Sequence, residues 1–214
     1  LYVRIDIFNP AGDKADVCGN GTRCVVKILF DENSEKETLK ILSDAGTLIA
    51  KKAGDEISVN MGKMTTDWKE IPLSEEMDSL NVPIEVKGFD KGVAVNIGNP
   101  HIVFFGKSIE NINLNQIGPK IEKHNFFPNK TNVEFIEILN SNTIKMKVWE
   151  RGAGVTLACG SGACAAVYAG WKKKLIESSA EVQLEKGSLH INIIDEEAIM
   201  TGPAEISYNG SIQI

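Results

Sequence analysis

The chain has 214 residues, of which 43% are hydrophobic and 24% are charged, and its formal net charge is −6. This length allows one or two domains with a sizeable core, and the composition is ordinary for a globular protein. Scattered basic residues in an acidic chain argue against a nucleic-acid partner, and no apolar run approaches the ~20 residues of a membrane span.

The first part of the chain is predicted to hold strands around one helix. Leu1–Phe8 alternates between apolar and polar residues, as a half-buried strand does, and turn residues follow it. Cys18-Gly19-Asn20-Gly21 leads into a short buried helix over Thr22–Phe30. Three more strands, separated by glycine turns, are then predicted at Leu39–Ser43, Thr47–Ala53 and Glu56–Asn60.

Residues 63–85 are polar and irregular and are predicted to be a link. Strands are expected at Lys91–Ile97 and Ile102–Phe105, followed by a helix over Asn111–His124 that Gly118-Pro119 must break or restart. The remaining predicted elements are a strand pair, a second buried helix and three strands: Val133–Leu139, Thr143–Glu150, Gly160–Lys174, Ser179–Leu184, Ser188–Ile194 and Glu197–Thr201.

Two segments of the chain are near copies of each other. Residues 18–30 read CGNGTRCVVKILF and residues 159–171 read CGSGACAAVYAGW, an offset of 141 residues from 18 to 159. The offset slips by one where Met61-Gly62 pairs with Thr201-Gly202, which fits a one-residue insertion or deletion in a loop. We predict an internal duplication with domains at 1–80 and 81–214, and the first domain could also receive the last strand of the chain.

The duplication also exposes a missing segment. The second copy has a lead-in before its cysteine, from about residue 84 to residue 143, whose counterpart would lie almost entirely before Leu1. We therefore expect that about 55 N-terminal residues of the natural protein are absent from this sequence. A chain that really lacked them should fold weakly and give no useful turnover.

Each copy places a cysteine where its helix is predicted to begin. Free N–H groups and the positive end of the helix dipole favour an anion there, which lowers a thiol pKa. The adjacent glycines let a ligand approach the backbone, and the same N–H groups can bind a carboxylate. Cys18 and Cys159 are therefore candidates for acid–base chemistry on one substrate, whereas Cys24 and Cys164 are expected to pack inside their helices.

The cysteine spacings do not predict a metal site. C-x5-C and C-x4-C differ from the usual spacing of zinc ligands, and four cysteines in a chain of this composition indicate reduced or reactive thiols.

Five segments resemble the diaminopimelate epimerase family: FNPAGDKADVCGNGTRC, NIGNPH, TNVEF, WERGAGVTLACGSGACAA and MTGPA. The resemblance implies an α+β fold of two pseudo-symmetric domains, each of antiparallel strands curled around a central helix, with the active site between them. It implies that L,L- and meso-diaminopimelate are interconverted in the cytoplasm by a homodimer, without pyridoxal phosphate, metal or other cofactor. The implied pathway is lysine and peptidoglycan precursor biosynthesis.

Matching positions also imply roles for individual residues. Cys18 and Cys159 would be the two bases, His101 and Glu150 would tune their pKa values, and Arg151 would pair with the distal carboxylate. The implied substrate-binding residues are Asn9, Gly19, Asn20, Asn99, Asn132, Glu150, Arg151, Gly160 and Ser161. His124 and His190 match no functional position, and the family's early Gly-Asn-Asp-Phe segment, which contributes a substrate-binding Asn, is absent here.

Three other interpretations stay open. A related cofactor-independent isomerase, of the proline racemase or methylitaconate isomerase kind, would be separated by a panel of α-amino acids. A redox switch would use a reversible disulfide between Cys18 and Cys159, and it gains if the reduced protein does no chemistry. A non-catalytic binding domain is disfavoured because both cysteines and Arg151 are present.

Overall fold

The computed structural model describes residues 2–8, 12, 18–43, 46–208 and 210–211. Within them lie three α-helices, α1 (Gly19–Glu32), α2 (Leu114–Glu122) and α3 (Gly160–Lys172), and a short 3-10 turn, η1 (Ser79–Asn81). The strands are β1 (Tyr2–Arg4), β2 (Thr38–Ser43), β3 (Gly46–Ala53), β4 (Glu56–Lys63), β5 (Val93–Asn96), β6 (Pro100–Gly106), β7 (Asn132–Asn140), β8 (Thr143–Glu150), β9 (Gly154–Thr156), β10 (Ser179–Leu184), β11 (Gly187–Ile194) and β12 (Glu197–Gly202).

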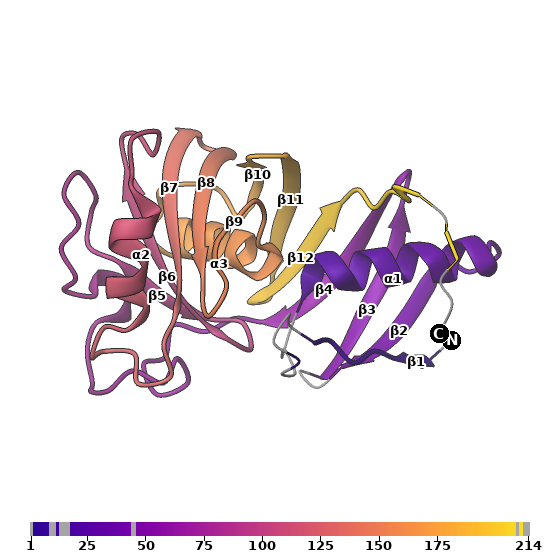
Figure 1. Ribbon diagram of the computed structural model, residues 1–214, viewed down its shortest axis with the longest axis horizontal. Helices are drawn as coiled ribbons and strands as arrows, with labels where there is room; N and C mark the ends of the chain where they lie inside the picture. Colours follow the sequence, from indigo (N-terminus) through magenta and orange to yellow (C-terminus); the bar gives the residue numbers. More distant parts are fainter. Residues whose placement is uncertain (1, 9–11, 13–17, 44–45, 209, 212–214) are drawn as a thin grey trace.

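The described strands form one hydrogen-bonded sheet that passes through two lobes. Its order is β1-β2-β3-β4-β12-β11-β10-β8-β7-β6-β5, with β9 paired to β8. Figure 1 shows α1 with β1–β4 in one lobe and α2 and α3 with the other strands in the second, joined where β12 lies beside β4. The mixed sheet with few helices confirms the predicted α+β class, while the division at residues 80 and 81 stays a prediction.

The strand register repeats between the lobes at the offset found in the sequence. Tyr2 pairs with Lys40 in the parallel β1–β2 ladder, and Thr143 pairs with Glu181 in the parallel β8–β10 ladder. The antiparallel ladders that follow in each lobe keep the same correspondence. Val59 of β4 pairs with Met200 of β12, its own counterpart, so the pseudo-twofold axis passes through this pair. The duplication is therefore structural as well as sequential.

The one-residue slip lies in a strand and not in a loop, which corrects the expectation. Asn60 pairs with Ile199, but Glu197 pairs with Lys63, so β4 carries one residue more than β12 over this stretch. Gly62 has a φ of +92°, and its N–H donates to the side-chain oxygen of Asn60 at 2.8 Å. A β-bulge absorbs the extra residue here without a loop, because only the local pairing is disrupted.

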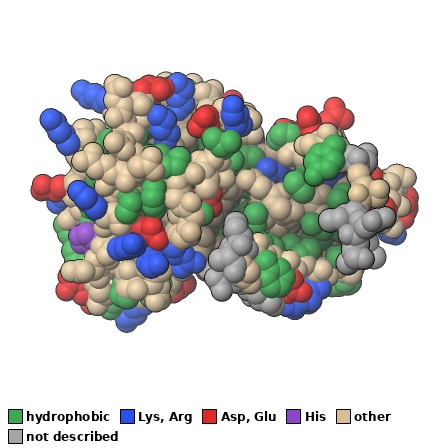
Figure 2. All heavy atoms as spheres, in the orientation of Figure 1, with side chains coloured by type: hydrophobic (Ala, Val, Ile, Leu, Met, Phe, Trp, Pro, Cys, Tyr) green, Lys and Arg blue, Asp and Glu red, His purple; other side chains and the backbone are tan. Residues whose placement is uncertain are grey.

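The two equivalent helices are covered to different degrees. In α3, every residue from Gly160 to Gly170 is buried, and the helix contacts β5, β6, β7, β10, β11 and β12 around it. α1 packs mainly on β4 and buries only one side, so Ile28 is half exposed. Figure 2 shows hydrophobic side chains at the surface of this lobe. A small, alanine- and glycine-rich helix suits α3, because strands approach it from most directions.

Several predicted elements have different bounds. β1 is shorter than Leu1–Phe8, and α1 begins at Gly19 instead of Thr22. α2 continues through Pro119 without a break: the missing N–H would have bonded to the carbonyl of Asn115, which is solvent-exposed and can be hydrated instead. The link was predicted to be irregular, but β4 extends into it as far as Lys63, and η1 forms within it.

Candidate active site

Both candidate cysteines cap helices. Cys18 is the N-cap of α1, and its Sγ accepts a hydrogen bond from the N–H of Gly21 at 3.3 Å. Cys159 is the N-cap of α3, and its Sγ accepts from the N–H of Gly162 at 3.4 Å. This confirms that each cysteine stands at a helix N-terminus, where backbone donors and the helix dipole act on the sulfur.

The two helix starts lie against each other because glycines occupy the contact. A Cβ on Gly160 would lie 3.5 Å from Cα of Gly19 and 3.0 Å from Sδ of Met200, and a Cβ on Gly19 would lie 2.6 Å from Cε of Met200. Met200 belongs to the strand pair on the pseudo-twofold axis. The first turns of α1 and α3, each beginning with a cysteine, therefore meet over this axis.

The two thiols have different surroundings. Cys159 is buried, and its sulfur lies 3.5 Å from Oγ of Ser161, whereas Cys18 is half-buried. Burial raises the pKa of the Cys159 thiol well above its usual range; Glu150 and Glu134 raise it further, while the hydrogen bonds of Ser161 and Gly162 lower it. The expectation that the helix N-terminus lowers the thiol pKa is therefore wrong for Cys159, because the desolvation of its thiolate outweighs the two hydrogen bonds.

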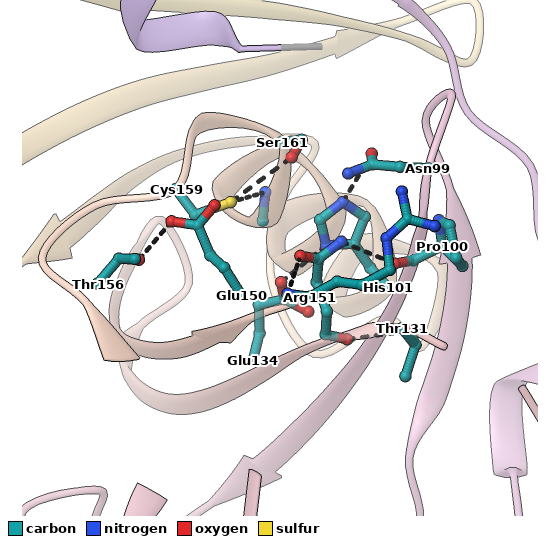
Figure 3. A network of polar contacts seen from close by, with 12 residues as sticks. Asn99, Pro100, His101, Thr131, Glu134, Glu150, Arg151, Thr156, Cys159 and Ser161 are labelled. Carbon is teal, nitrogen blue, oxygen red and sulfur yellow. Dashed lines mark hydrogen bonds and ion pairs between the residues drawn. The ribbon is translucent and has the colours of Figure 1, made fainter. Parts of the chain in front are cut away.

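Glu150 lies at the end of β8 next to Cys159. Its carboxylate accepts a hydrogen bond from the hydroxyl of Thr156 on β9. In Figure 3 the Glu150 carboxylate and the Ser161 hydroxyl both point toward the Cys159 sulfur. The acidic group expected to tune a thiol is thus in place, and its charge favours the protonated form of Cys159.

His101 is fully buried between two polar side chains. Nδ1 lies 2.7 Å from Oε1 of Glu134, and Nε2 lies 3.0 Å from Oδ1 of Asn99 (Figure 3). Both ring nitrogens therefore have a hydrogen-bond partner, which fixes the orientation of the imidazole. His101 therefore connects the expected substrate-binding residue Asn99 to a buried carboxylate.

Glu134 was not identified as a site residue from the sequence, although it stands in the segment TNVEF. It is fully buried, and its Oε2 is without a hydrogen-bond partner among the described residues. Burial raises its pKa, and His101 opposes this. A Cβ on Gly162 would lie 2.7 Å from its Oε1, so glycine is needed for the carboxylate to lie under the start of α3. The sequence signal that could have identified Glu134 is a glutamate in the middle of an apolar strand.

Asn132 and Arg151 are joined through the backbone. The side chain of Asn132 is buried; its Nδ2 donates to the carbonyl of Pro100 at 3.0 Å, and its Oδ1 accepts from the N–H of Arg151 at 2.9 Å. Nη1 of Arg151 donates to the carbonyl of Asn129 at 3.3 Å. Asn132 thus holds together the two segments that carry His101 and Arg151.

The remaining predicted residues are distributed as follows. Asn9 lies outside the described residues, so its placement stays a prediction. Asn20 follows Gly19 in the first turn of α1, and its Oδ1 accepts a hydrogen bond at 2.9 Å from Arg23. The guanidinium of Arg23 is buried and also donates to the carbonyl of Pro203 at 3.3 Å, a contact that the sequence analysis did not foresee.

The other thiols and histidines lie outside this cluster. All four cysteines are free, and burial raises the pKa of Cys164 to about 12, in agreement with a packing role. Cys24 is exposed, which contradicts the expected packing role: it lies beside Ile28 in a hollow between α1 and residues 204–208. His190 is exposed and His124 is half-buried, and the absence of a functional role for either stays a prediction.

Neither a membrane-spanning helix nor a metal cluster is found among the described residues. No helix there is both long enough and apolar enough to cross a membrane. Nor do three or more His, Cys, Asp or Glu side chains gather in that part of the chain as metal ligands would.

Comparison with known proteins gives strong matches. The family model described as diaminopimelate epimerase matches residues 2–66 and 93–207. A diaminopimelate epimerase of Pelagibacter ubique is 41% identical over 221 aligned positions, covering all of this chain and 80% of the relative.

Two solved structures share the fold. A phenazine biosynthesis protein of the PhzF family from Enterococcus faecalis superimposes with a TM-score of 0.69 at 16% identity, covering 99% of this chain and 78% of the other. A hydroxyproline epimerase from Agrobacterium vitis gives a TM-score of 0.64 at 13% identity, covering 92% and 65%. At these identities the likeness concerns the fold alone.

Proposed function

Since this chain belongs to the diaminopimelate epimerase family and is an isomerase, we propose that it interconverts L,L- and meso-diaminopimelate with Cys18 and Cys159 as its two bases. One thiolate takes the α-proton of the substrate, and the opposite thiol gives its proton to the other face of the same carbon. One proton is taken and one is given, so each turnover leaves the protein with the same number of protons. The carrying observation is that two cysteine-capped helices meet at Gly19 and Gly160.

The difference between the thiols suggests their roles in the described state. Cys159 has a raised pKa, so it holds its proton and is suited to be the acid. In the direction in which Cys159 gives its proton to the substrate, the base is then Cys18, which is half-buried. In the reverse direction the roles exchange, as the reversal of a two-base reaction requires.

Binding groups at both ends of the substrate support the assignment. The N–H groups at the starts of α1 and α3, in Gly19-Asn20 and Gly160-Ser161, suit the α-carboxylate. Arg151 suits the distal carboxylate, because a guanidinium forms charge-assisted bonds with such a group. An α-proton is weakly acidic, so fixed positioning and electrostatic stabilisation must supply most of the barrier reduction.

His101 and Glu150 would adjust the charge around Cys159. Glu150 disfavours a thiolate there, while His101 is hydrogen-bonded to Glu134 under the same helix start. We extend the proposal, on family membership, to a role in lysine and peptidoglycan precursor biosynthesis, to catalysis without a cofactor and to a homodimer.

The test is hydrogen exchange at the α-carbon. The reduced product of the full-length gene is incubated with L,L-diaminopimelate in D2O, and deuterium at one α-carbon is followed together with the meso isomer. Cys18→Ala and Cys159→Ala should each lower the rate at which the meso isomer forms by at least about 100-fold, the scale of a lost general acid or base. Cys24→Ala, an exposed cysteine on the same helix as Cys18, is the matched control and should keep the wild-type rate.

Two results would count against this function. No exchange from folded, reduced protein would reject diaminopimelate as the substrate and favour a related isomerase. Formation of the meso isomer at the wild-type rate in both cysteine variants would reject the two-thiol mechanism.

A further inference from the structure

A buried carboxylate that takes no part in the proposed proton transfer ends helix α2. Glu122 is 4% exposed, and both of its side-chain oxygens accept hydrogen bonds. Oε2 accepts from the indole Nε1–H of Trp149 at 2.8 Å, and Oε1 accepts from the backbone N–H of Gly152 at 3.2 Å. These two donors lie on either side of Glu150-Arg151 in the sequence, so one carboxylate holds both ends of this dipeptide.

The dipeptide lies in a tight turn between β8 and β9. The turn is closed by a hydrogen bond at 3.1 Å from the N–H of Ala153 to the carbonyl of Glu150. Gly152 has a φ of +77°, a backbone conformation that favours glycine. Asn132 accepts the N–H of Arg151, and Glu122 accepts the next N–H along the chain. Two buried side chains therefore set the direction in which Arg151 leaves the backbone.

Helix α2 is packed so that Glu122 can reach this turn. A Cβ on Gly118 would lie 2.4 Å from the indole ring of Trp149, so the ring lies directly on the helix backbone. The carbonyl of Glu122 also accepts the N–H of Thr131 at 3.2 Å, which closes the loop that leads to Asn132. The same loop provides the Asn129 carbonyl to which Arg151 donates. Glu122 lies where helix, loop and turn meet.

We propose that Glu122 is a positioning residue, which fixes Glu150 and Arg151 in the geometry needed for substrate binding. This rests on the proposed function only in assigning Arg151 to the distal carboxylate. A carboxylate is required because two N–H donors face its two oxygens, and an ionised carboxylate only accepts. Glutamine has the same shape but offers one acceptor and one donor group, so Glu122→Gln must lose at least one of the two bonds.

The first measurement follows these two bonds by NMR. The chain has three tryptophans, so the indole N–H signals are few, and Trp149→Phe identifies that of Trp149. In Glu122→Gln, the Trp149 indole signal, the Gly152 amide signal or both should shift and exchange faster with solvent. Glu137→Gln is the matched control: Glu137 accepts the N–H of Ile109 at 3.3 Å, which a single amide oxygen can replace.

The second measurement separates positioning from general stability. In Glu122→Gln, KM for diaminopimelate should rise about tenfold, the scale of one lost hydrogen bond to a charged group, and kcat should change less. Adding Trp149→Phe removes one donor and leaves the glutamine oxygen free for Gly152. The double variant should therefore have a KM close to that of Trp149→Phe alone, a coupling that general destabilisation would not produce.

The outcomes decide the proposal. Shifted N–H signals with a raised KM support it. Unchanged signals in Glu122→Gln overturn it, as does an unchanged KM when the signals have moved. If the wild-type protein itself shows no turnover, the proposed function fails on that result, and the two N–H signals still decide whether Glu122 holds the turn.

Discussion

The contact between Gly162 and Glu134 allows a prediction with an internal control. In Gly162→Ala, the new Cβ would lie 2.7 Å from Oε1 of Glu134, well inside the ~3.3 Å of a close carbon–oxygen contact. The buried carboxylate must then move away from Nδ1 of His101, which lies 2.7 Å from it. Gly21 is the equivalent residue of α1, and among the described residues a Cβ there would lie within 4 Å of Cys18 alone.

The comparison of the two variants isolates the cost of moving the carboxylate. Both substitutions gain roughly the same helix propensity, about 1 kcal/mol, and both place a Cβ 3.3 Å from the sulfur of the capping cysteine. Only Gly162→Ala disturbs a hydrogen bond to a charged group, worth about 1.5–3 kcal/mol. We therefore expect Gly162→Ala to be less stable than Gly21→Ala by about 1.5–3 kcal/mol.

The assay is urea unfolding of the two variants beside the wild-type protein. Thermal unfolding should agree, with Gly162→Ala melting about 3–12 °C below Gly21→Ala, because 1 kcal/mol shifts Tm by about 2–4 °C at this chain length. The His101 ring signals should also change in Gly162→Ala alone. Equal stability of the two variants, with unchanged His101 signals, would show that Glu134 does not depend on the missing Cβ.

Three further predictions concern the thiols. Glu150→Gln should lower the pKa of Cys159, and each unit of that decrease should speed its alkylation at neutral pH about three- to fourfold, because the thiolate fraction rises about tenfold while the nucleophilicity of the thiolate falls; an unchanged rate, measured by peptide mass spectrometry, would contradict the role of the carboxylate. Native protein should be alkylated at exposed Cys24 but not at buried Cys164, whose pKa is raised to about 12, and equal labelling would contradict the packing of α3. The folded Cys159 thiol keeps its proton where the unfolded thiol loses it, so its stabilising contribution is full below pH ~8.5 and is lost as pH rises through the folded pKa. Above pH ~8.5 the stability of Cys159→Ala should therefore fall less steeply than that of wild type, by up to about 1.4 kcal/mol per pH unit in urea titrations; equal slopes would contradict the raised pKa.

Strands and repeated segments were the parts most accessible from the sequence. Thr143–Glu150 and Ser179–Leu184 were predicted with the bounds that the structure has, because alternation between buried and exposed residues marks a strand directly. The start of α1 was placed too late, since glycine has low helix propensity and cysteine is not among the usual N-cap residues. β9 was missed because three residues between turns carry too little pattern.

The candidate site was predictable where it is local and not where it depends on tertiary pairing. The position of each cysteine at a helix start could be predicted from the few residues around it. The contact between His101 and Glu134 needs the parallel pairing of β6 and β7, which joins residues 33 positions apart. The raised pKa of Cys159 depends on burial and on two carboxylates from other strands, so helix-terminus reasoning alone gave the wrong direction.

The strand pair on the pseudo-twofold axis has a consequence for the chemistry. Val59 facing Met200 is the arrangement of an isologous dimer, in which one surface pairs with a copy of itself across an exact axis. In such a dimer both thiols would be identical, with equal burial and equal proton affinity. Joining the two halves in one chain removes that constraint, and here Cys159 is buried beside two carboxylates while Cys18 is half-buried. Fusion therefore allows the two cysteines to differ in burial and in the charges around them.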